Sequence, residues 1–211
     1  VGAVYSATDA VTLYAGWSQS YLPQSGDQFS SLDASTAALE PESFENFEIG
    51  AKYQPMPEFL LTAAIYRLDR DNTRAPGAVA GTTVLTGSQR SEGLEISLQG
   101  EIRDGWDVAA AYALQSAEIT KTTSSAPEGR KVPLVPEQSL SVWNKFAVTS
   151  RLGTGLGVIW QDAQYASITN TVTLPSFTRV DAALYYDLTD TLGLQLNVEN
   201  LLGETYWTNA H

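Results

Sequence analysis

The stretch NFEIGAKY at residues 46–53 alternates polar and apolar side chains along its whole length. In an extended chain, Phe47, Ile49, Ala51 and Tyr53 fall on one face, and the residues between them fall on the other. A helix would scatter these apolar residues around its axis. The period of two therefore predicts a β-strand with one apolar and one polar face.

The same pattern recurs along the chain. It is clear at 94–99, 179–186 and 192–199, whereas 58–71 is partly apolar on both faces and an Asn interrupts 137–148. We therefore predict an all-β chain. The predicted strands are 1–6, 10–22, 43–54, 58–71, 84–102, 106–121, 137–148, 155–167, 175–187 and 191–207.

The links between these strands alternate in length. The short links are 7–9, 55–57, 103–105, 149–154 and 188–190, and the longer or more Gly-, Ser-, Thr- and Pro-rich links are 23–42, 72–83, 122–136 and 168–174. Long strands with tight turns at one end and loops at the other indicate an antiparallel up-and-down meander. Outer-membrane β-barrels have this arrangement, with short periplasmic turns and long external loops. A soluble sandwich would more often show strands of about 5–6 residues without this asymmetry.

The composition excludes several classes of function. Asp and Glu number 24 against 12 Lys and Arg, for a net charge of −12, whereas nucleic-acid binding usually needs a basic face. The chain has no Cys and a single His at position 211, which leaves no thiolate site and no histidine cluster for metal or acid–base chemistry. No apolar run approaches the roughly 20 residues of a transmembrane helix, but barrel strands need none.

The strand pattern also predicts an incomplete barrel. If the short turns are periplasmic, the last predicted strand runs outward and no return strand follows it. An open edge would leave unpaired backbone groups in lipid. The chain begins at Val1 without an initiator Met or an apolar signal segment. We therefore expect a fragment without its original beginning and end, with about ten strands of a barrel of roughly 22.

Four short motifs, in the same order, resemble those of TonB-dependent outer-membrane receptors. LEPE at 39–42 leads into FEIGAKY at 47–53, which resembles the family's L-x-P-E…x-E-x-G-x-K strand. QRSEGLE at 89–95 resembles its R-S-x-G-x-E strand, and VPLVP at 132–136 resembles the approach to a later strand. Each motif is weak alone, but together they cover nearly the whole chain.

The fourth motif, NVENLLGETY at 197–206, is similar to the N-x-x-N-L-F-D-x-x-Y signature close to the family's C-terminus. Leu202 and Gly203 stand where the family usually has Phe-Asp. The family's P-G-x-P-R segment, its last strand and its N-terminal plug domain are absent from residues 1–211, which we expect to be one partial barrel domain. NTVTLP at 170–175 and TRVD at 178–181 most resemble the ferric-siderophore branch, although the cobalamin, haem and carbohydrate branches stay open.

The resemblance implies a transmembrane β-barrel in the bacterial outer membrane that takes up ferric siderophores. The implied partners are the ferric siderophore, the TonB complex through the missing plug, and outer-membrane lipid, but not nucleic acid. It implies no enzyme activity and no cofactor, because iron should stay inside its chelator, so no metal ligands are expected in the protein.

Such a receptor needs aromatic and cationic groups on its outer loops and strand ends to hold an anionic chelate. The candidate ligand-binding residues are Tyr21, Phe29, Arg70, Arg74, Arg130, Lys131, Tyr165, Tyr206 and Trp207. The residues expected to face the lumen or plug are Glu48, Lys52, Glu95, Glu101, Arg179 and Asp181.

Two other functions fit parts of the pattern. A passive porin-like barrel would share the strands but have no plug. A soluble acidic β-domain that binds carbohydrate or protein would account for the charge, and it predicts a chain that folds without detergent.

Overall fold

The computed structural model describes residues 1–23, 40–76, 83–123 and 126–209, with the side chains of 74–76 and 83–86 excepted. Its strands are β1 (Gly2–Ser6), β2 (Val11–Leu22), β3 (Glu42–Met56), β4 (Phe59–Pro76), β5 (Thr83–Arg103), β6 (Trp106–Lys121), β7 (Gln138–Ala147), β8 (Leu152–Gln161), β9 (Gln164–Tyr165), β10 (Thr173–Leu174), β11 (Phe177–Thr189) and β12 (Leu192–Val198). No helix of the described part is long and apolar enough to cross a membrane.

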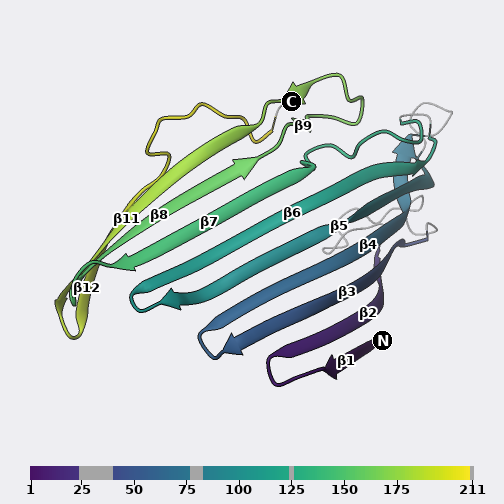
Figure 1. Cartoon of the computed structure of the whole chain (residues 1–211). Helices are drawn as coiled ribbons and strands as arrows, with labels where there is room; N and C mark the ends of the chain where they lie inside the picture. Colours follow the sequence, from purple (N-terminus) through teal and green to yellow (C-terminus); the bar gives the residue numbers. More distant parts are fainter. Residues whose placement is uncertain (24–39, 77–82, 124–125, 210–211) are drawn as a thin grey trace.

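One curved sheet contains nearly all of these strands (Figure 1). It has ten strands in the order β1-β2-β3-β4-β5-β6-β7-β8-β11-β12, and β9 and β10 form a separate small hairpin. Every pair of neighbours is antiparallel. The predicted all-β, up-and-down architecture is confirmed.

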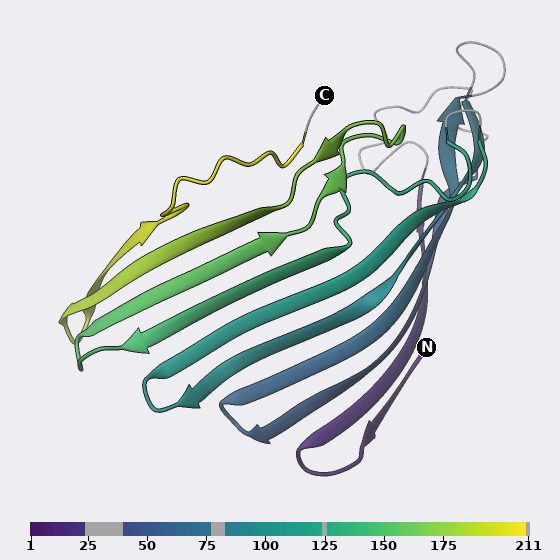
Figure 2. The same ribbon diagram turned by 45° about the horizontal axis from the view of Figure 1, so that its top comes forward.

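The connections differ between the two ends of the sheet. Tight turns join the strands along one rim, which we call the turn rim, and the strand ends that precede and follow the longer connections lie along the opposite rim, the loop rim (Figures 1 and 2). The β9–β10 hairpin lies at the loop rim, within the connection from β8 to β11. The predicted asymmetry of the links is therefore a feature of the fold.

The strand register assigns each side chain to one of two faces. One row across the sheet is apolar or aromatic, and the adjacent row is mostly polar or small. The apolar row is Leu13, Ala51, Ala63, Ile96, Tyr112, Leu140 and Trp160, and the adjacent row is Tyr14, Gly50, Ala64, Glu95, Ala113, Ser139 and Gln161. A hollow of about 510 Å³ lies over the polar row, which identifies this side as the concave face of the curved sheet.

The described residues form no conventional core. No large side chain of the described part is fully buried, whereas convex residues such as Ile49 and Leu196 are each 61% exposed. A soluble protein rarely leaves so continuous an apolar surface in water. An apolar outer face and a polar inner face are instead the arrangement of a membrane barrel, whose acyl-chain environment replaces the core.

Two predicted strands end earlier than the sequence pattern indicated. The prediction for 155–167 is divided between β8 and β9, and the last strand ends at Val198 and not at residue 207. Asn200 and Gly203 adopt positive φ angles of 52° and 68°, which a β-strand does not accommodate. The clear alternation at 192–199 therefore ends where the chain leaves the sheet, and the predicted extension of this strand to residue 207 was wrong.

Candidate functional site

The convex face becomes charged toward the loop rim. The last apolar row on β4, β5 and β6 is Ile65, Leu94 and Leu114, and the row beyond it is Arg67, Glu92 and Ser116. On β5, the apolar convex positions between Leu94 and Ile102 span about the 9–11 residues that cross a bilayer. Because ionised groups are costly in the hydrocarbon, this change marks the outer limit of the apolar zone.

The charged residues beyond that limit are paired with one another. Arg67 and Arg90 both donate from Nε to the carboxylate of Asp69, at 2.8 Å and 2.7 Å. Farther along the same side, Lys131 meets Glu118 at 2.9 Å across an isolated antiparallel bridge. We call this set the outer charged belt: Arg67, Asp69, Arg90, Glu118 and Lys131.

Aromatic pairs flank the apolar zone at both rims. Trp17 lies 6.5 Å from Phe47 toward the loop rim, and its indole N–H donates to the Glu45 carboxylate at 2.7 Å. Toward the turn rim, Trp106 stacks on Phe146 with ring centroids 5.8 Å apart. The indoles of Trp17 and Trp106, each with an apolar body and one polar N–H, suit the two membrane–water interfaces.

The concave face holds all six residues expected to face the lumen or plug. Arg179 and Asp181 form an ion pair at 2.8 Å, and the Lys52 ammonium lies 5.7 Å from the Tyr14 ring centre. Glu101 accepts a hydrogen bond from the Gly105 N–H at 2.9 Å, which closes the turn before β6. The concave positions are Glu48, Lys52, Glu95, Glu101, Arg179 and Asp181. Contact of any of them with a plug stays a prediction.

A second hollow lies on the concave side near the loop rim. Its volume is about 330 Å³, and its lining includes Phe44, Leu68, Arg70, Val132, Leu134 and Pro136. The Arg70 guanidinium lies 5.4 Å from the Phe44 ring centre and donates from Nη2 to the Glu42 carboxylate at 2.6 Å. Glu42 is buried. Its carboxylate lies against the Arg70 guanidinium and neutralises the charge of that group. The hollow thus combines an aromatic ring, aliphatic side chains and a paired cation.

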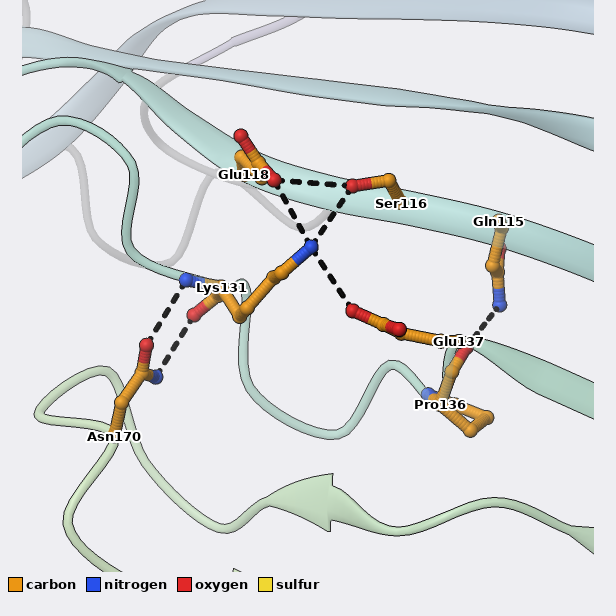
Figure 3. Close-up of polar contacts among 7 residues, drawn as sticks. All are labelled: Gln115, Ser116, Glu118, Lys131, Pro136, Glu137 and Asn170. Atoms are coloured by element: carbon orange, nitrogen blue, oxygen red, sulfur yellow. Dashed lines mark hydrogen bonds and ion pairs between the residues drawn. The ribbon is translucent and has the colours of Figure 1, made fainter.

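Lys131 ties the β6–β7 connection to the end of β6 (Figure 3). Its ammonium donates to Ser116 and Glu118 at 3.0 Å and 2.9 Å and lies 3.0 Å from Glu137. The hydrogen bond to Glu118 raises the pKa of Lys131 despite the opposing effect of desolvation. Ser116 and Glu118 occupy convex register positions, so this ammonium lies on the convex side and not over the concave face.

The same connection is bound to the one between β8 and β11. The Asn170 side chain accepts from the Lys131 backbone N–H at 2.9 Å and donates to the Lys131 carbonyl at 3.0 Å (Figure 3). Arg130 donates to the Ile168 carbonyl at 3.1 Å, and the Leu134 N–H donates to the Tyr165 carbonyl at 2.9 Å. These contacts join two loops that are far apart in the sequence into one unit.

The segment after β12 continues toward the loop rim beside β11. Its Tyr206 ring stacks on Phe177 with centroids 4.4 Å apart, and its hydroxyl accepts from Arg179 at 3.2 Å. Trp207 follows and is 53% exposed. Aromatic groups and a cation therefore come together at the loop rim on the concave side.

Comparison with known proteins assigns the family. Residues 1–201 match the family described as TonB dependent receptor-like, beta-barrel. The chain belongs to the TonB-dependent receptor β-barrel family. It is therefore a stretch of the wall of an outer-membrane β-barrel. The resemblance of the four motifs is confirmed, and nothing now supports a soluble acidic domain.

Several relatives are siderophore receptors. The chain is 34% identical to the probable TonB-dependent siderophore receptor PiuA of Acinetobacter baumannii, over 100% of this chain and 29% of that protein. It is 31% identical to the catecholate siderophore receptor Fiu of Escherichia coli, over 97% of this chain and 28% of that protein. The chain thus spans less than a third of the length of these relatives.

Solved structures agree with the fold. The crystal structure of PiuA superposes with a TM-score of 0.88 at 30% identity, over 100% of this chain and 32% of that one. The closed form of Fiu superposes with a TM-score of 0.83 at 29% identity, over 99% of this chain and 31% of that one.

In this TonB-dependent receptor barrel, the predicted ligand-binding residues are divided between different places. Arg70 lines the hollow near the loop rim, and Tyr206 and Trp207 lie on the segment beside β11. Tyr21 occupies a convex register position, and Lys131 belongs to the outer charged belt, so neither faces the concave hollow. Arg130 and Tyr165 lie in the joined loops. Phe29 and the side chain of Arg74 lie outside the described residues. Ligand contact by any of the nine stays a prediction.

Two kinds of residue were not predicted from the sequence: Arg67, Asp69 and Arg90 of the outer charged belt, and the asparagines Asn170 and Asn200. The outer charged belt had a readable signal, because Arg67, Asp69 and Arg90 continue the apolar alternation of their strands. Asn170 and Asn200 both adopt positive φ, which Asn tolerates better than most residues, but the partners that attach them to the rest of the structure, Lys131 and Asp181, are distant in sequence. Among the described residues, no group of three or more His, Cys, Asp and Glu could hold a metal ion.

Proposed function

We propose that the whole receptor takes up ferric siderophores through the outer membrane with energy supplied through TonB. This chain supplies part of the barrel wall and part of the outer ligand-facing surface. The observation that carries the proposal is the concave loop rim, which has the aromatic rings of Phe44 and Tyr206 and the guanidinium groups of Arg70 and Arg179, each paired with a carboxylate. Ferric chelates are frequently anionic and aromatic. The rings suit the aromatic part of such a ligand, and each guanidinium has N–H donors beyond those used by its carboxylate, although that carboxylate offsets its charge.

The relatives support the class of ligand. PiuA and Fiu are described as siderophore receptors, and each aligns with nearly all of this chain. The chain itself needs no reactive group for this role, because a receptor binds and passes its ligand without making or breaking bonds in it. We therefore expect no enzymatic activity and no bound cofactor.

The test is iron uptake by the intact receptor. The parent gene is deleted, and the uptake of radioactive iron is measured with a panel of purified ferric siderophores under iron limitation. We expect the loss of saturable uptake of at least one ferric siderophore, with recovery on complementation. The same complemented strain without functional TonB should not recover, which separates this function from passive diffusion through a porin-like barrel.

The contrary result is equally clear. The proposal fails if the purified full-length receptor binds no ferric siderophore saturably and the deletion leaves iron-limited growth unchanged. Uptake that persists without TonB would favour the passive barrel.

A further inference from the structure

Residues 199–208 form a segment that we call the inner strap. It leaves the end of β12 and runs toward the loop rim beside β11 (Figures 1 and 2). Its backbone has left the strand conformation, although the Leu201 N–H still donates to the Val180 carbonyl at 2.7 Å. The strap is therefore held to the wall largely by side chains.

The carboxylate of Asp181 anchors both parts of the strap. Its Oδ1 accepts from the Asn200 backbone N–H at 2.8 Å. Its Oδ2 accepts from Arg179 at 2.8 Å and 3.2 Å, and the same guanidinium donates to the Tyr206 hydroxyl. The Asp181 side chain is only 13% exposed, so these charge-assisted hydrogen bonds are largely shielded from water. One carboxylate thus fixes Asn200 directly and Tyr206 through Arg179.

The strap between these two anchors is closed on itself. The Asn200 side chain accepts from the Glu204 N–H and donates to the Glu204 carbonyl, each at 2.9 Å. Gly203, with φ of 68°, gives the backbone the turn that this closure needs. Residues 200–204 therefore form a closed turn, and Tyr206, two residues later, is held separately by Phe177 and Arg179.

The hold on the strap weakens after Tyr206. The next contact with the wall is a long one, from the Gln164 amide to the Thr208 carbonyl at 3.5 Å. The Gln164 side-chain oxygen is buried without a hydrogen-bond partner in the described part of the chain. Trp207 lies between the firm anchor at Tyr206 and the weak one at Thr208.

We propose that Asp181 is a positioning residue for ligand binding, because it holds the inner strap so that Tyr206 and Trp207 form one side of the outer mouth. This inference rests on the proposed function and identifies a residue that acts without touching the ligand. Asp181→Asn should release the strap. An amide has one acceptor oxygen in place of two charged ones, and its NH₂ group would face the Arg179 donors.

The test uses the full-length receptor in detergent with Asp181→Asn. The matched control is Asp187→Asn, on the same strand and at a concave register position near the turn rim, away from the strap. Spin labels at Thr205→Cys on the strap and Ser141→Cys on β7, in a background without other cysteines, report the strap position by electron-paramagnetic-resonance distance measurement. Affinity is measured for the ferric complex of 2,3-dihydroxybenzoate and for the ferric siderophore found in the uptake panel.

We expect the distance distribution to broaden in Asp181→Asn and the affinity to fall about tenfold, the scale of one lost charged hydrogen bond. Asp187→Asn should change neither. Tyr206→Phe is a milder second variant that still tests the proposal if Asp181→Asn does not fold. It removes only the hydroxyl bonded to Arg179, keeps the ring stacked on Phe177, and should broaden the distribution less.

The outcomes separate the two proposals. A distribution as narrow in Asp181→Asn as in the wild type overturns the positioning role. A loosened strap with unchanged affinity overturns its link to the ligand. A wild-type receptor that binds no ferric chelate overturns the proposed function, and with it the ligand role of the strap, whatever the distance distribution shows.

Discussion

The side chain of Asn170 brackets the backbone of Lys131, accepting from its N–H at 2.9 Å and donating to its carbonyl at 3.0 Å. The side-chain amide of Asn170 forms the two hydrogen bonds that the backbone of a neighbouring strand would otherwise form with the Lys131 N–H and carbonyl. Lys131 is bridged on its other side to Glu118 of β6. The connection between β8 and β11 is therefore attached through Lys131 to the main sheet, and the two loops should order together.

The bracket predicts that Asn170→Gly will loosen both loops. Asn170 has φ of 54°, which Gly accepts without strain, so the substitution removes the amide and keeps the backbone. Each lost hydrogen bond costs about 0.5–1.5 kcal/mol, and the backbone amide of Lys131 should exchange with solvent at least several-fold faster. Hydrogen exchange of the full-length receptor measures this.

Asn170→Asp is the matched control for the bracket. It keeps the acceptor for the Lys131 N–H and loses the donor to the carbonyl, so the exchange rate of that amide should rise less. If the Lys131 amide exchanges at the wild-type rate in Asn170→Gly, the two loops are ordered by other contacts.

The alkaline behaviour of the β6–β7 connection should depend on Lys131. Its pKa is raised above the ordinary 10.5, first by the hydrogen bond to Glu118. A group whose pKa is raised on folding contributes stability that is complete below its unfolded pKa and is lost as pH rises through the folded value. The ammonium should therefore protect this loop up to about pH 10 and lose its effect above the raised pKa.

Proteinase K cleavage between residues 126 and 137 of the full-length receptor measures that protection. Cleavage of Lys131→Met should be modestly faster than wild type at pH 8–10, because partly exposed ion pairs contribute about 0.2–1 kcal/mol. The difference should vanish as pH rises beyond 10.5. Lys121→Met removes a lysine that forms no ion pair among the described residues, and it should match wild type throughout. A difference that grows with pH would contradict the assignment.

The fold was largely readable from the sequence, because a period of two reports which face each side chain occupies. Residues 46–53 alternate in sequence and in the sheet alike. The end of the last strand was predicted too late, at residue 207, although the apolar alternation stops at Val198 and Asn200 turns the backbone away toward Asp181. Contacts such as this one are set by residues distant in sequence, and alternation contains no information about them.

The candidate site was less readable, for a physical reason. An Arg or Lys in an outer loop is available to a ligand only if no carboxylate neutralises it. Arg70 meets Glu42, and Lys131 meets Glu118 and Glu137, yet none of these pairings follows from spacing along the chain. Composition predicted that the site needs aromatic and cationic side chains, but it did not predict which cationic side chains have no carboxylate partner.

The pairing of Arg70 predicts that Glu42→Gln will strengthen the binding of an anionic ferric chelate. Gln can still accept a hydrogen bond from Arg70 but no longer cancels its charge. On the order of 1 kcal/mol of added attraction would lower Kd about three- to tenfold at low salt, and less at high salt. Titration of the full-length receptor with the ferric siderophore, at low and high salt, measures this.

Glu45→Gln is the control for that change. Glu45 lies on the same strand but at a convex register position, where its carboxylate accepts from Trp17. Its neutralisation should leave Kd within twofold at either salt concentration. Equal Kd values for wild type and Glu42→Gln at low salt would show that Arg70 does not face the bound chelate.

Leu98 and Gln99 are adjacent on β5 and occupy opposite faces, so they offer a direct test of which side meets the acyl chains. Leu98 pairs with Leu61 and Ala110 on the convex face, and Gln99 pairs with Leu60 and Ala109 on the concave face. Leu98→Arg would place a guanidinium in hydrocarbon and should lower the folding stability of the full-length receptor by about 2–4 kcal/mol. Gln99→Arg would place the same group in the polar lumen, where a shift within about 0.5 kcal/mol is expected. Urea unfolding in phospholipid vesicles gives both values. Equal losses would mean that the convex face is not the lipid face, and a larger loss for Gln99→Arg would reverse the assignment of the two surfaces.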